Sequence, residues 1–162
     1  MKKRTIVLVG AIIFIVIFGI GAAFFCKYFV NKNVWAKYTS DQLMTMADKN
    51  WTSKAMFFKG LEGNFIIIDQ GTAPYPRGLI IYDLNNKKEV FSDKYSQPLD
   101  ITGATVNYWE PTTQKVTAVN CPELVNWAKE GLGAEMEKHV SFILTTLTLK
   151  DLSEAHRCMA TQ

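Results

Sequence analysis

The sequence predicts an α+β fold, in which an N-terminal transmembrane helix precedes a small antiparallel β-sheet domain with two short helices. Three observations support this class. Residues 5–25 form a run of twenty-one uncharged, mostly apolar residues, long enough to cross a bilayer. Residues 78–93 hold two apolar runs on either side of a polar turn, which is typical of an antiparallel hairpin. Residues 39–50 and 122–130 carry apolar side chains at helical spacing.

The apolar run of residues 5–25 is expected to be a signal anchor that spans the membrane once. As a helix it would measure about 31 Å at a rise of 1.5 Å per residue, close to the ~30 Å hydrocarbon thickness of a bilayer. Two alternatives stay open. Gly21-Ala22-Ala23 offers a cleavage site for a secretory signal peptide. Cys26 is a candidate for lipid attachment, although the bulky Phe24-Phe25 pair before it is unusual at such a site.

The first four residues, Met-Lys-Lys-Arg, predict the orientation, because basic residues beside a membrane segment stay in the cytoplasm. We expect residues 1–4 to be a cytoplasmic tail, residues 26–38 a juxtamembrane linker and residues 39–162 an exported α+β domain. In a bacterium this arrangement is a single-pass protein of the inner membrane with its C-terminal domain in the periplasm.

The charge of the exported part argues against nucleic acid as a partner. Residues 1–30 contain four basic residues and no acidic ones, whereas residues 31–162 contain fourteen Lys or Arg and fifteen Asp or Glu. A nearly neutral domain lacks the basic surface that tracks phosphates. We therefore expect the membrane, through residues 5–25, and a protein or component of the envelope as partners.

The first elements after the linker follow from local signals. Residues 39–50 predict a short helix, with Thr39 or Ser40 as its cap and Asp41 in the first turn. Met56–Phe58 and Phe65–Ile68 predict two strands joined by a turn over Gly60–Gly63.

The hairpin prediction is more detailed, with strands at Gly78–Asp83 and Glu89–Asp93 and a turn over Leu84–Lys88. Next, Thr105–Trp109 predicts a half-buried strand that ends before Pro111.

The C-terminal third is expected to mix strands with one helix. Lys115–Val119 predicts another strand, and Pro122–Glu130 a helix that Asn120 caps and Gly131 ends. A strand over Val140–Leu149, a turn over Lys150–Ser153 and a closing strand to Cys158 complete the expected domain.

The cysteines predict a disulfide bond between Cys121 and Cys158. Both lie in the exported part, where an oxidising compartment allows pairing, whereas Cys26 adjoins the membrane. The alternative makes Cys121 a nucleophile whose thiol pKa the following helix lowers, with His139 as its base.

Catalytic signatures are missing from the sequence. It has no G-x-S-x-G, S-x-x-K, P-loop or G-x-G-x-x-G pattern. The two histidines, His139 and His156, lack metal-ligand spacing. We expect no catalytic residue, no metal and no cofactor.

Contact with a partner is expected at two segments. Tyr75 and Arg77 are residue types enriched at binding hot spots, and neighbouring prolines stiffen their loop. Tyr108 and Trp109 join them if both segments reach the same end of the sheet. The competing interpretation makes the Tyr75–Arg77 loop a rigid connection that leads into a strand, and the tryptophan a core residue.

Three segments carry a resemblance, namely Arg77–Leu84, Tyr108–Pro111 and Asn120–Leu124. Over about residues 65–162 the chain resembles small, uncharacterised bacterial envelope proteins with an N-terminal anchor or lipid and one periplasmic domain. The resemblance implies a location and no activity. The expected function is a membrane-anchored periplasmic module that binds another envelope component. An envelope enzyme with an unrecognised site and an accessory subunit of a membrane complex are the alternatives.

Overall fold

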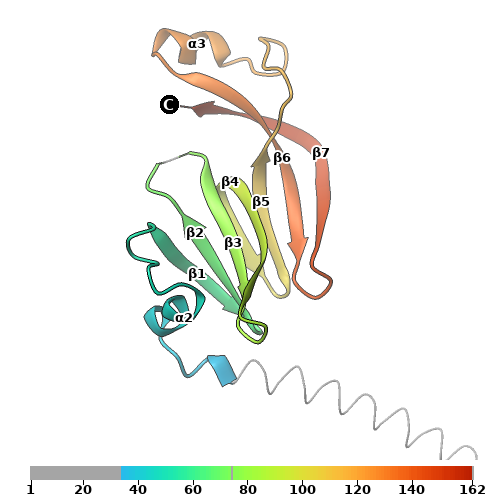
Figure 1. Cartoon of the computed structure of the whole chain (residues 1–162). Coiled ribbons are helices and arrows are strands. Elements are labelled where there is room, and N and C mark those ends of the chain that lie inside the picture. Colours follow the sequence, from blue (N-terminus) through green and yellow to red (C-terminus); the bar gives the residue numbers. More distant parts are fainter. Residues whose placement is uncertain (1–33, 74, 162) are drawn as a thin grey trace, which may run out of the picture. The chain divides into compact units, whose positions relative to one another are not determined.

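The computed structural model describes residues 34–73 and 75–161, without the side chains of residues 153–155. The chain divides into two units, Met1–Tyr38 and Thr39–Gln162, and the second contains the folded domain (Figure 1). No helix in the described ranges is long and apolar enough to cross a membrane. The predicted span, residues 5–25, lies outside those ranges.

The second unit is a meander of antiparallel strands with two short helices. The helices are α2 (Ser40–Ala47) and α3 (Leu124–Lys129). In chain order the strands are β1 (Met56–Glu62), β2 (Phe65–Gln70), β3 (Arg77–Asp83), β4 (Lys88–Thr102), β5 (Thr105–Pro111), β6 (Gly133–Ile143) and β7 (Thr148–Thr161). Each strand pairs with the next in the sequence, so the order in the sheet is the order in the chain.

The predicted α+β class is wrong, because the described domain is mostly an antiparallel sheet. An α+β domain needs helices that cover a face of the sheet. The eight-residue α2 buries only Leu43 and Met44, and the six-residue α3 buries no side chain. The apolar faces of the strands pack instead against one another, as in all-β folds.

A bend in β4 divides the sheet into two halves. Up to Tyr95 the strand pairs with β3, and from Ser96 it pairs with β5. Ser96 lies opposite Trp109 and Asp100 opposite Asn107, so the β4 side holds extra residues between these pairs, as in a β-bulge. Pro98 lies within the irregular stretch, where its missing N–H interrupts a ladder least.

Residues from both halves form one core. Phe91 of β4 stacks on Phe142 of β6 with ring centroids 4.0 Å apart, and Tyr95 meets Tyr108 edge to face. Burial of each large apolar side chain contributes about 1.5–3 kcal/mol. The buried cluster consists of Ile67, Leu79, Ile81, Tyr95, Val106, Tyr108, Val140, Phe142 and Leu144.

Local predictions in the first half of the domain are confirmed in part: the turn predicted over Gly60–Gly63 is wrong, because β1 continues to Glu62 and the chain turns at residues 63–64. Thr39 caps α2 through its side chain and forms a capping box with Gln42. The hairpin at residues 78–93 is β3 and the start of β4, although β4 continues for nine residues beyond the predicted end at Asp93.

Several predictions in the last third are wrong. Residues 115–119 form no strand, and Asn120 accepts a hydrogen bond from the Thr117 backbone N–H instead of capping α3. The final hairpin turns at residues 144–147, not at 150–153, and Leu147 has a φ of 53° there. An uninterrupted run of Thr and aliphatic residues contains no Gly or Pro to mark this turn, so its position depends on the pairing of β6 with β7.

Candidate functional site

A buried carboxylate, Asp69, lies near the end of β2 and is 1% exposed. Arg77 of β3 donates from Nε to Asp69 Oδ1 at 2.6 Å, and Lys59 Nζ of β1 lies 3.2 Å from Oδ2. Phe57 and Leu79 lie opposite Asp69 in the flanking strands. The period of two along a strand places Arg77, two residues from Leu79, on the same face as Asp69. Lys59 lies at a register shift of β1 between Phe58 and Gly60, and its ion pair places its ammonium beside Asp69.

The phenol of Tyr95 adjoins this ion-pair group. Tyr95 lies opposite Arg77 in the β3–β4 ladder and its side chain is completely buried. Within residues 34–73 and 75–161 its hydroxyl has no partner at hydrogen-bond distance, but it interacts with the Asp69 carboxylate and the Arg77 guanidinium beside it. Burial, followed by the negative charge of Asp69, raises the pKa of Tyr95 to about 12. The hydroxyl is therefore protonated at physiological pH and can donate a hydrogen bond.

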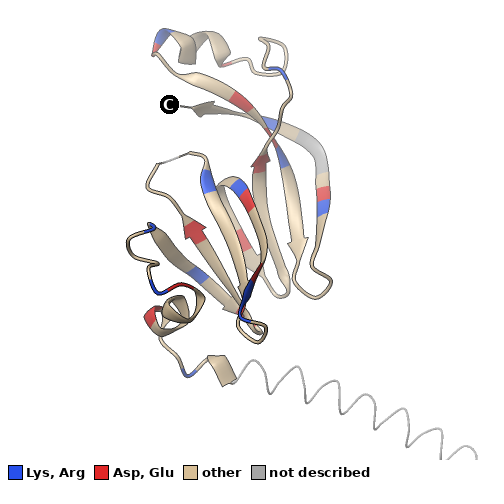
Figure 2. Cartoon of the chain, in the orientation of Figure 1, with Lys and Arg blue, Asp and Glu red and all other residues tan. Residues whose placement is uncertain are grey.

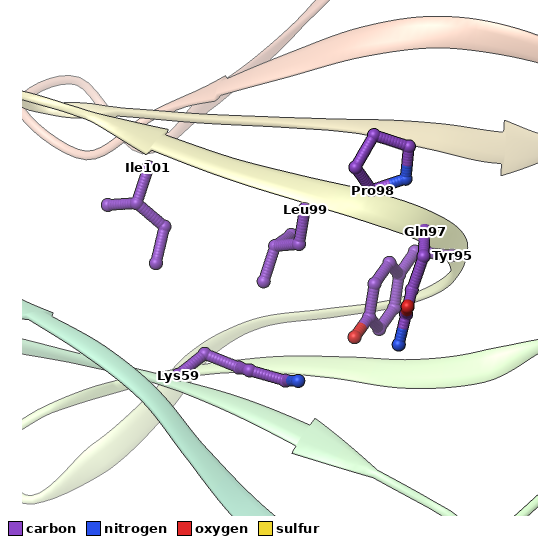
Figure 3. A pocket seen from close by; sticks show the side chains of 6 residues that line it. All are labelled: Lys59, Tyr95, Gln97, Pro98, Leu99 and Ile101. Atoms are coloured by element: carbon purple, nitrogen blue, oxygen red, sulfur yellow. The ribbon is translucent and has the colours of Figure 1, made fainter.

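A pocket of about 250 Å³ opens beside Tyr95, between β1 and the second half of β4. Gln97, Leu99 and Ile101 alternate along β4 and point to the same side of the strand, and the ring of Pro98 points to the other (Figure 3). Figure 3 also shows the Tyr95 hydroxyl, the Gln97 amide and the Lys59 ammonium directed toward the same space. The pocket is lined by Lys59, Tyr95, Gln97, Pro98, Leu99 and Ile101.

The pocket combines hydrogen-bond donors with an apolar wall. Lys59 and Arg77 carry two positive charges against the single negative charge of Asp69, which leaves one positive charge at this group. Elsewhere on the sheet Lys and Arg are mixed with Asp and Glu (Figure 2). The arrangement suits a ligand with one anionic group and an apolar part.

A second polar cluster holds the bend of β4. The completely buried Glu137 of β6 accepts hydrogen bonds from Ser96 Oγ and from Arg157 Nε, the latter at 2.5 Å. Arg157 of β7 also donates to the backbone oxygen of Gln97 at 2.8 Å. A buried carboxylate with a cation and a hydroxyl is fully paired. The cluster therefore positions the backbone at the pocket rim.

Two of the four residues predicted for binding, Tyr75 and Arg77, make contacts within the domain. Tyr75 donates from its hydroxyl to Glu135 Oε2 at 2.8 Å. Burial and this carboxylate raise the pKa of Tyr75. Arg77 pairs with the buried Asp69, and neither residue is part of the pocket lining. The Arg77 ion pair and the Tyr75 hydrogen bond therefore attach the Tyr75–Arg77 loop to other parts of the domain.

Tyr108 and Trp109 also have contacts within the domain. Tyr108 is completely buried and its hydroxyl donates to Asp93 Oδ2 at 2.7 Å. Trp109 stacks on His139 on one side and meets the Arg157 guanidinium 4.2 Å from the ring centroid. A binding role for Tyr75, Arg77, Tyr108 and Trp109 stays a prediction.

Sequence analysis did not identify Lys59, Tyr95 and Gln97 as site residues. For Tyr95 and Gln97 the sequence contained one signal. Tyr95, Gln97, Leu99 and Ile101 occupy every second position around a proline. Alternation of this kind predicts a strand that continues through a bulge at the proline. Nothing in the sequence places Lys59 beside this strand.

The predicted disulfide bond between Cys121 and Cys158 is present, with the two Cα atoms 5.4 Å apart. It joins the segment before α3 to β7. His156 Nδ1 lies 2.7 Å from Gln114 Oε1, and His139 stacks on Trp109. In the part of the chain that the structure describes, no three His, Cys, Asp or Glu residues are grouped to hold a metal ion.

The chain matches no protein-family model, and comparisons with curated proteins and with solved structures find no similar protein.

Proposed function

We propose that the chain is a membrane-tethered module whose exported domain binds a component of the cell envelope without catalysing a reaction. The observation that carries this proposal is the pocket beside Tyr95. Its lining combines the polar side chains of Lys59 and Gln97 with the aliphatic side chains of Leu99 and Ile101. Small-ligand sites likewise combine an apolar wall with polar groups that orient the ligand.

The location is proposed from the N-terminal sequence and the disulfide bond. Three basic residues before an uncharged run of twenty-one residues favour a cytoplasmic N-terminus and an exported domain. The Cys121–Cys158 bond supports an oxidising compartment such as the periplasm.

The alternative enzyme, with Cys121 as nucleophile, has less support. The sulfur of Cys121 is bonded to Cys158 and the residue is completely buried. A thiolate nucleophile has to be free and accessible. The binding proposal is therefore favoured over thiol catalysis.

Reporter fusions test the proposed location. We expect alkaline phosphatase fused after Gln162 to be active and a cytoplasmic reporter at the same site to be inactive, because the phosphatase folds only outside the cytoplasm. Carbonate extraction of the membrane fraction separates tethered from released protein. The matched control replaces Lys2, Lys3 and Arg4 by Gln, which should reduce correct orientation. A phosphatase that stays inactive in the unaltered chain would overturn the exported location.

A further inference from the structure

The segment before α2 carries a cluster of two aromatic rings and a lysine. The ring centroids of Trp35 and Tyr38 lie 5.7 Å apart, and Lys37 Nζ lies 5.2 Å from the centroid of the Tyr38 ring. The Tyr38 backbone N–H donates to the Trp35 carbonyl oxygen at 3.0 Å, so a turn holds the two residues together. Both rings are partly exposed, and Lys37 is exposed.

This combination of side chains suits the headgroup layer of a membrane. Trp and Tyr are enriched where hydrocarbon meets headgroups, because their rings are apolar and their N–H or O–H groups are polar. A lysine beside them attracts the phosphate of an anionic lipid. Val34, which is 41% exposed, adds apolar surface at the start of the same segment.

The position of the cluster in the chain allows it to reach that layer. The uncharged run ends at residue 25, and eight residues, 26–33, separate it from Val34. Eight residues span at most about 29 Å when extended and about 12 Å as a helix. The headgroup layer is roughly 5–8 Å thick on each side of the hydrocarbon. If residues 5–25 cross the bilayer, residues 34–38 are therefore within reach of the headgroups.

The charges of the chain divide at residue 38. Residues 26–38 contain Lys27, Lys32 and Lys37 and no acidic residue, whereas residues 39–162 contain twelve Lys or Arg and fifteen Asp or Glu. Each lysine close to an anionic membrane surface strengthens binding about fivefold. The net negative domain is repelled by the same surface. Anionic lipids therefore favour contact through the segment before α2 over contact through the sheet.

We infer that residues 34–38 bind the headgroup layer of an anionic phospholipid membrane, with the rings of Trp35 and Tyr38 at its boundary and Lys37 on a lipid phosphate. The inference rests on the proposed membrane tether and names the class of lipid that the tether contacts. Lys27 and Lys32 add charge of the same sign in the stretch before the cluster.

The test uses the full-length chain in lipid nanodiscs and the quenching of tryptophan fluorescence by brominated lipids. Bromine on an acyl chain quenches only a tryptophan that touches the lipid. Two preparations carry the bromines either on phosphatidylglycerol or on phosphatidylcholine, at the same mole fraction. We expect brominated phosphatidylglycerol to quench at least about fivefold more strongly at low salt. About 0.5 M NaCl should remove most of this difference, because salt screens the attraction.

Two variants test the cluster, and two matched variants serve as controls. Trp35→Phe should remove most of the quenching, whereas Trp127→Phe, which changes another partly exposed tryptophan, should leave it unchanged. Lys37→Gln should lower the preference for phosphatidylglycerol about twofold to fivefold. Lys54→Gln is its control, because Lys54 is also exposed and pairs with Asp48 within the folded domain. Thermal unfolding of each variant verifies that it folds.

The inference is overturned if both brominated lipids quench the unaltered chain equally at low salt, or if Trp35→Phe keeps the full quenching. Failure of the tether itself has a different signature, because carbonate would then release the unaltered chain from its membrane, and that result would overturn both proposals. A chain that resists carbonate but shows no preference for phosphatidylglycerol contradicts only the lipid inference. The two failures are therefore distinguishable.

Discussion

At the scale of single residues, two tyrosines in the same core have opposite hydrogen-bonding situations. Tyr95 and Tyr108 are both completely buried, and their rings meet edge to face. The Tyr108 hydroxyl donates to Asp93, whereas that of Tyr95 has no partner among the described residues. A buried hydroxyl stabilises a fold only when it is bonded. The pair therefore separates a hydroxyl with a short hydrogen bond to a carboxylate from one without such a bond.

Phenylalanine substitutions should show this difference in the absence of ligand. Tyr108→Phe should lower the free energy of unfolding by about 1–2 kcal/mol, because it removes a bond to a carboxylate. Tyr95→Phe should leave that free energy unchanged or raise it by about 1 kcal/mol, because it removes an unpaired buried donor. Urea unfolding followed by tryptophan fluorescence measures both. Equal losses in the two variants would contradict the assignment.

At the scale of elements, α3 depends on its connections more than on its own burial. It has six residues, no side-chain cap and no buried side chain, so its intrinsic stability is low. The disulfide bond fastens the preceding segment to β7 at a completely buried Cys121. The covalent bond thus holds in place a part of the chain that packing alone holds weakly.

Removal of the disulfide should destabilise the domain through a single shared constraint. Cys121→Ser and Cys158→Ser should each lower the free energy of unfolding by about 4 kcal/mol, the chain-entropy value for a 37-residue separation. The double variant should be little worse, because either change opens the same loop. Thermal unfolding measures the effect. Thiol titration of the unfolded, unreduced chain should detect only Cys26, and additive losses would contradict the pairing.

At the scale of the whole domain, the bend of β4 brings its second half close to β1. A Cβ atom added to Gly60 of β1 would lie 2.8 Å from Ile101 Cδ1 of β4. The glycine thus permits a close approach of two strands that are not neighbours in the sheet. The same approach encloses the pocket, because Lys59 lies next to Gly60 and Ile101 is part of the wall.

A double-mutant cycle tests this approach. Gly60→Ala should lower the free energy of unfolding by about 1–2 kcal/mol through crowding, and Ile101→Val should cost about 1 kcal/mol. Together they should cost at least about 0.5 kcal/mol less than their sum, because valine lacks the crowded methyl group. Urea unfolding measures all four proteins. Ile81→Val is the control partner, with additive effects expected, and additivity between Gly60 and Ile101 would contradict the packing.

The sequence alone predicted the features that depend on neighbours along the chain. The Thr39 cap of α2 and the hairpin after Gly78 follow from signals a few residues apart. The pairing of Cys121 with Cys158 followed from an expected oxidising compartment and the position of Cys26. The cap and the hairpin need no knowledge of which distant strands meet, because capping and alternation act between residues a few positions apart.

Only the tertiary structure decided the fold class and the candidate site. The bend of β4 at Ser96–Pro98 decides whether strands or helices cover the apolar faces. The bulge at this bend is set by the pairing of β4 with β5. The grouping of Lys59 and Asp69 with Tyr95 depends on the registers of three ladders at once. A shift of one residue in any of them would turn these side chains to the opposite face, so no local pattern in the sequence contains the site.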